Sequence, residues 1–140
     1  DDVPEAVHAC GDGAYGRLAQ LTKPISFTAL LERLKALYGV ANLQVAKPEG
    51  MASEVRAIAV AAGAGSSVLR GARADVLVTG EMSHHEVLAA VADGTAVVLA
   101  GHSNTERGFL RVLGERLTSE FGEALQVKVA ESDRDPLAVV

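Results

Sequence analysis

Hydrophobic and polar positions change their spacing several times along the chain. From Ser26 to Gly39 the apolar residues recur every three or four positions, and the glycine supplies a stop signal. This stretch predicts an amphipathic helix. Before it, residues 16–21 predict a short strand, whereas residues 1–13 are polar and predict an irregular leader.

The rest of the chain alternates short apolar runs with helical patterns. Strands are predicted over residues 43–46, 55–61, 75–79, 96–100 and 125–130, and helices over residues 68–70, 83–92 and 104–117. Nearly continuous apolar strands separated by helices are typical of a sheet buried on both faces. We therefore predict an α/β fold in one domain over residues 14–140, with a mostly parallel or mixed sheet and helices on both faces. Ligands of such sheets gather at the carboxyl ends of the strands.

Composition and charge narrow the function classes. A hydrophobic content of 49% with 22% charged residues is a globular balance. The net charge of −5 and the lack of a basic cluster argue against a direct nucleic-acid ligand. No apolar run reaches the roughly 20 residues that a membrane span needs. The single Cys10 favours a reducing compartment, which we expect to be the cytoplasm, with the nucleus or mitochondria as alternatives. The acidic start at Asp1, in place of Met, suggests a piece of a longer protein.

The loop after residues 96–100 combines a histidine and a carboxylate. Ser103 and Glu106 fit a capping box, with Ser103 or Asn104 as the helix cap. Glu106 also precedes the apolar stripe of the next helix, so we expect it to face the sheet beside His102. Histidine nitrogen and carboxylate oxygen suit Zn, Fe or Mn. Spacing alone leaves capping and metal ligation both open.

The loop after residues 75–79 carries two adjacent histidines, His84 and His85. Ser83 and Glu86 again fit a capping box. Neighbouring residues of a helix point in different directions, so at most one histidine faces His102. A neutral imidazole there could act as a ligand, a proton shuttle or a substrate donor.

Three further features can be explained by a structural role as well as by a functional one. The loop of residues 63–67 fits a tight turn better than an anion site, because it lacks the lysine of a P-loop. Arg107 is either solvated or paired with a substrate anion. Asp133 and Asp135 predict only a polar turn. The sequence contains no Gly-x-Ser-x-Gly elbow of a serine hydrolase.

These loops together resemble the Nif-three-like family, whose bacterial members are often labelled type 2 GTP cyclohydrolase I. The resemblance rests on GAGSSVL at residues 63–69, ADVLVTGEMSHH at 74–85, GHSNTERGFL at 101–110 and SDRDPL at 132–137. It implies the carboxyl-terminal half of a protein with two related α/β halves, a dinuclear metal centre and a homo-oligomeric assembly. His102 and Glu106 fall on family metal ligands, and His85 falls on a pocket histidine with a catalytic role. The remaining ligands belong to the other half, so the site in this chain is incomplete.

Two functions follow from the resemblance. The first is a metal-dependent hydrolase of unknown substrate, in which His85 moves protons. No residue supports the cyclohydrolase label itself. The second is a non-catalytic interaction or assembly module with a transcriptional regulator as its partner.

Overall fold

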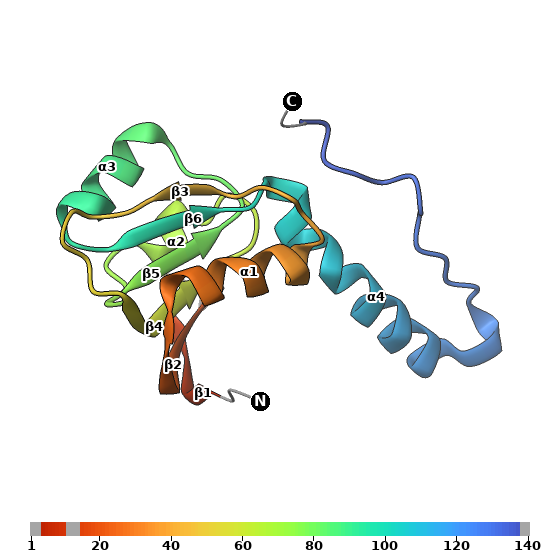
Figure 1. Ribbon diagram of the computed structural model, residues 1–140. Helices are drawn as coiled ribbons and strands as arrows, with labels where there is room; N and C mark the ends of the chain where they lie inside the picture. Colours follow the sequence, from red (N-terminus) through yellow and green to blue (C-terminus); the bar gives the residue numbers. More distant parts are fainter. Residues whose placement is uncertain (1–3, 11–14, 138–140) are drawn as a thin grey trace.

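The computed structural model describes residues 4–10 and 15–137 (Figure 1). Its elements in chain order are strands β1 (Pro4–Cys10) and β2 (Gly16–Ser26), helix α1 (Phe27–Tyr38), strands β3 (Gln44–Ala46) and β4 (Glu54–Val60), helix α2 (Ser66–Leu69), strand β5 (Val76–Thr79), helix α3 (His84–Ala92), strand β6 (Ala96–Leu99), helix α4 (His102–Phe121) and the 3-10 helix η2 (Gly122–Ala124).

The strands form one mixed sheet in the order β1-β2-β4-β5-β6-β3. Strand β5 pairs in parallel with both β4 and β6. The pairs β1·β2, β2·β4 and β3·β6 are antiparallel. The predicted α/β class is confirmed, although the sheet is parallel only in its centre. The carboxyl ends of β4, β5 and β6 share one edge, as ligand sites of this class require.

Helices cover both faces of the sheet, and each face has its own apolar core. Helix α1 packs Leu30 and Leu34 against Val76 and Val78 on one face. On the other face, Leu77 of the same strand packs with Leu69 of α2. Strand β5 is thus buried on both sides, as its continuous apolar sequence predicts.

Helix α1 confirms its start and stop signals. The Ser26 hydroxyl accepts a hydrogen bond of 3.1 Å from the backbone N–H of Ala29, as an N-cap does. Gly39 ends the helix with φ 65°, a left-handed conformation that costs glycine little.

Two predictions about the ends of the chain are wrong. Residues 4–10 of the predicted irregular leader form β1, which pairs with β2 from Cys10↔Gly16 to Pro4↔Leu21. An antiparallel edge strand can leave a face in water, so its side chains need not be apolar. Residues 125–130 have the alternation of a strand but pair with no described strand. They run back beside α4, where Val127 and Val129 lie next to Gly114.

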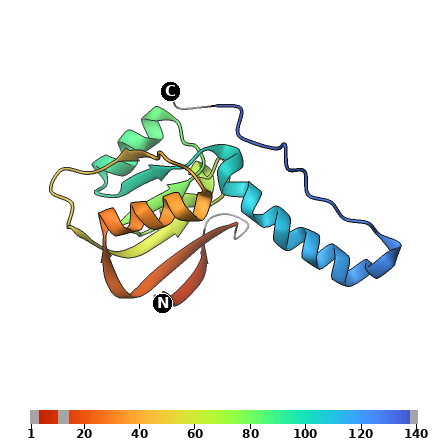
Figure 2. The ribbon, with the colours of Figure 1, turned by 45° about the vertical axis from the view of Figure 1, so that its right-hand side comes forward.

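Helix α4 extends away from the sheet in both views (Figures 1 and 2). None of its residues is buried. The stripe of Phe109, Leu110 and Leu113, expected to face the sheet, is exposed. Within the described part of the chain, no helix is long and apolar enough to cross a membrane.

Candidate functional site

His102 is the first residue of α4 and not the last residue of the preceding strand, because β6 already ends at Leu99. Gly101 precedes the helix with φ 92°, which lets the chain turn sharply out of the sheet. The predicted cap by Ser103 or Asn104 is wrong, since no side chain caps this helix. The Asn104 amide donates instead to the carbonyl of Ala100, at 2.8 Å.

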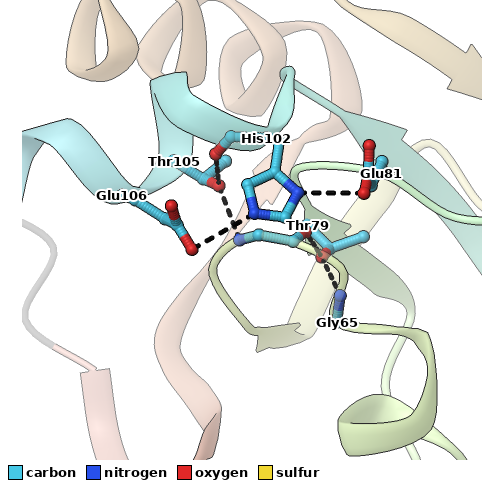
Figure 3. Close-up of polar contacts among 7 residues, drawn as sticks. Gly65, Thr79, Glu81, His102, Thr105 and Glu106 are labelled. Carbon is cyan, nitrogen blue, oxygen red and sulfur yellow. Dashed lines mark hydrogen bonds and ion pairs between the residues drawn. The ribbon is translucent and has the colours of Figure 1, made fainter.

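His102 and Glu106 lie beside one another at this sheet edge, as predicted (Figure 3). The distance between His102 Nε2 and Glu106 Oε1 is 3.4 Å. The two residues are one helical turn apart, a spacing that brings side chains together. Glu106 was expected to face the sheet, yet its side chain is 54% exposed and that of His102 is 45% exposed. The site therefore opens to solvent on this side.

Glu81 is a member of the cluster that the sequence interpretation missed. Its Oε1 lies 2.9 Å from Nδ1 of His102, so a carboxylate stands on each side of the imidazole (Figure 3). The hydrogen bond with Glu81 raises the pKa of His102, and the nearby charge of Glu106 raises it further. A signal was present, because Glu81 follows the end of β5 at the same sheet edge.

Gly63 joins the three loops that carry these residues. Its carbonyl accepts hydrogen bonds from the backbone N–H of Gly80 at 3.0 Å and of Glu81 at 3.1 Å. Its own N–H donates to Thr105 Oγ1 at 2.9 Å, and that hydroxyl donates to the carbonyl of His102 at 2.8 Å. These hydrogen bonds hold the loops of Gly63 and Glu81 against the first turn of α4, which carries His102.

Gly63 also lies directly against the two candidate ligands. A Cβ added there would be 2.7 Å from Glu106 Oε1 and 3.0 Å from His102 Nε2. Its φ of 63° also disfavours other residues. Gly65 packs similarly close to Thr79, whose hydroxyl accepts from the Gly65 N–H at 3.0 Å. The tight-turn interpretation of this loop is therefore confirmed.

The separation of the histidine and carboxylate fits one metal ion. Two donors about 2.1 Å from a tetrahedral ion lie roughly 3.4 Å apart, which is the distance between His102 Nε2 and Glu106 Oε1. Among the residues that the structure describes, however, no group of three His, Cys, Asp or Glu is arranged to hold an ion. Glu81 faces the other ring nitrogen and does not complete the set.

His85 lies in the first turn of α3 and its ring is exposed. Its Nε2 is 3.3 Å from the Ser83 hydroxyl. Glu86 accepts from the backbone N–H of Ser83 at 3.3 Å and from its hydroxyl, which bears out the predicted capping box. The described ion-pair partners of the His102 ring are Glu81 and Glu106, and they do not include His85.

The polar turn near the end of the chain folds back onto the first turns of α4. Arg107 Nε donates to Asp133 at 2.9 Å, and its Nη1 donates to Asn104 at 3.1 Å. Arg107 Nη2 is buried without a hydrogen-bond partner among the described residues. Asp135 adds negative charge near His102. Arg107 therefore forms an internal ion pair with Asp133, and its side chain is 30% exposed.

Comparison with known proteins identifies the family. A family model described as Duf34/NIF3 (NGG1p interacting factor 3) matches residues 6–136. The chain belongs to the Duf34/NIF3 family. The suspected Nif-three-like resemblance is therefore confirmed.

Relatives in this family are longer than the chain. Mouse NIF3-like protein 1 is 45% identical over 127 residues, which cover 89% of this chain and 34% of the mouse protein. NGG1-interacting factor 3 of Saccharomyces cerevisiae is 38% identical over 131 residues, or 89% of this chain and 45% of the yeast protein. The chain thus spans less than half of these NIF3 relatives.

A solved structure has a fold similar to that of this chain. The Staphylococcus aureus protein SA1388 superposes with a TM-score of 0.71 over 89% of this chain and 37% of that protein. Its sequence identity is 21%, so the likeness concerns the fold alone.

Proposed function

We propose that this NIF3 chain supplies His102 and Glu106 as two ligands of a divalent transition-metal site, with Zn, Fe or Mn as the ion. The observation that supports it most is the carboxylate on each side of one imidazole. A neutral imidazole has a single N–H and can donate to only one of them. The lone pair of the other ring nitrogen then faces a negatively charged carboxylate without a hydrogen bond. A cation between this nitrogen and the carboxylate would stabilise the arrangement.

Two protein ligands leave the site incomplete, because a stable protein site usually has about three or more. The other ligands would come from the region that the longer relatives possess and this chain does not match. We therefore expect weak metal binding by the chain alone.

The chemistry we propose is hydrolysis of an unidentified substrate. A divalent ion at this position would supply Lewis-acid polarisation and lower the pKa of water. His85 is proposed to move protons, since its exposed ring stands in the first turn of α3, the helix that follows β5. Glu106 and His102 would hold the ion beside the solvent-exposed edge of the sheet.

Paramagnetic broadening by Mn²⁺ tests the metal proposal in the chain as it stands, because it detects weak binding. At substoichiometric Mn²⁺, the amide resonances of Gly63 and Gly80 should broaden first, since both residues contact the cluster. The variant His102→Ala should remove this local broadening. The matched control His8→Ala, on edge strand β1, should retain it. Broadening that survives in His102→Ala would contradict the proposal.

A protein-interaction module is the second candidate function. The yeast relative is named for an interaction with NGG1, and α4 presents exposed Phe109 and Leu113. Exposed apolar patches often mark interaction surfaces. The same face of α4 would form the contact between copies of the chain in a homo-oligomer, which stays a prediction. Binding of NGG1 that falls in Leu113→Ser but not in His102→Ala would favour this function over the metal site.

A further inference from the structure

The two carboxylates around His102 come from different parts of the fold. Glu106 belongs to the same helix as the histidine, one turn later. Glu81 belongs to the loop after β5, and its backbone is tied to the neighbouring loop by a hydrogen bond from its N–H to the carbonyl of Gly63 and by a parallel bridge with Ala64. Glu81 therefore approaches the ring from a loop outside α4.

We propose that Glu81 is a positioning residue that orients His102 and fixes its tautomer. The proposal rests on the metal-ligand role proposed above. The Glu81 contact, at 2.9 Å to Nδ1, is shorter than the Glu106 contact, at 3.4 Å to Nε2. The single N–H of the neutral ring is therefore placed on Nδ1, and the lone pair of Nε2 faces Glu106. Metal-binding histidines commonly have such a carboxylate on their other nitrogen.

Glu81 acts through the ring and does not bind the ion itself. Its carboxylate lies against Nδ1, while Glu106 lies against Nε2, and the two ring nitrogens point in different directions. A single ion next to Nε2 and Glu106 is therefore out of reach of the Glu81 oxygen that bonds Nδ1. This agrees with the lack of a three-residue metal group among the described residues.

Ring nitrogen-15 shifts of His102 in the metal-free chain test the proposal, at a pH where the imidazole is neutral. The wild type should show protonated Nδ1 and unprotonated Nε2. Glu81→Ala should lose this preference. Glu81→Gln should largely keep it, because the amide oxygen can still accept from Nδ1. Glu49→Ala, which removes an exposed carboxylate elsewhere, is the control and should match the wild type.

A Mn²⁺ titration provides the second measurement. Loss of an outer partner typically weakens metal binding about 10–100-fold, so Glu81→Ala should need that much more Mn²⁺ for equal broadening at Gly63. Glu81→Gln should show a smaller change. Complete loss of broadening in Glu81→Ala, as in His102→Ala, would make Glu81 a direct ligand and overturn the proposal.

The tautomer result separates this inference from the metal proposal. A wild-type ring protonated on Nε2, or a tautomer unchanged in Glu81→Ala, overturns the positioning role even when Mn²⁺ binds at the site. Absence of Mn²⁺ broadening in a wild type with protonated Nδ1 overturns the metal proposal and leaves the Glu81–His102 geometry standing.

Discussion

The sheet with its covering helices and the extended helix α4 contain similar apolar residues, but only the first region buries them. Val76, Val78 and Val98 are fully buried in the sheet, whereas Phe109 and Phe121 of α4 are each 52% exposed. Helix α4 relies on local interactions, such as the pair of Arg111 and Glu115 at 3.0 Å, which is exposed and contributes little. Tertiary stability thus resides in the sheet region.

The candidate site lies where these two regions meet. Glu81 and Gly63 belong to loops of the sheet region, while His102 and Glu106 belong to the first turns of α4. The hydrogen bond between the Gly63 N–H and Thr105 Oγ1 joins the two regions. The two candidate metal ligands therefore lie in the part of α4 that is hydrogen-bonded to the loops of the sheet region.

The largest difference between the regions should appear in the free energy of unfolding. Leu69→Ala removes a side chain that is 1% exposed in the core under α2, and should destabilise the protein by about 2–5 kcal/mol. Leu113→Ala on α4 should change stability by only about 0.5 kcal/mol. Urea denaturation of both variants measures this, and equal losses would show that α4 is packed as tightly as the sheet.

A second comparison concerns two glycines with nearly the same backbone. Gly63 has φ 63° and Gly39 has φ 65°, so alanine at either costs about 1–2 kcal/mol of left-handed strain. Only at Gly63 would the added Cβ meet His102 and Glu106, because nothing lies within 4 Å at Gly39. Gly63→Ala should therefore lose Mn²⁺ broadening at Gly80, while Gly39→Ala keeps it. Equal binding by the two variants would argue against a site at this pair.

The smallest effect is expected at the cap of α3. Ser83→Ala should destabilise the protein by about 1 kcal/mol at neutral pH. The Ser83 hydrogen bonds lower the pKa of Glu86. The stability that Glu86 gains from them is therefore present above the unfolded-state pKa of Glu86 and is lost as the pH falls through its folded-state pKa. The difference from wild type should thus shrink in acid. Ser119→Ala on α4, an exposed control, should show no such pH dependence.

The sequence predicted those helices and strands whose start, stop or burial depends on neighbouring residues. The stop at Gly39, the apolar run of β5 and the capping box at Ser83 were all readable from neighbouring residues. Strands at the ends of the chain were not, because a strand needs a partner that alternation cannot identify. Residues 125–130 have the pattern of a strand without a described partner, and β1 has a partner without the pattern.

The candidate site likewise has one contact that is local in sequence and one that is not. Helical spacing was enough to bring Glu106 next to His102, although the helix begins two residues earlier than predicted. Glu81 meets the histidine across 21 positions of sequence, through the pairing of β5 with β6 and the loop contacts of Gly63. The sequence places Glu81 just after β5, at the same sheet edge, but only the tertiary arrangement shows that it contacts His102.

Metal analysis after loading with zinc or iron and dialysis against metal-free buffer tests the half-site most directly. The chain alone should retain far less than one ion per molecule, because His102 and Glu106 supply too few ligands. Full-length mouse NIF3-like protein 1, prepared in parallel, should retain stoichiometric metal. Stoichiometric zinc or iron in the chain alone, retained in the His85→Ala variant, would contradict the account.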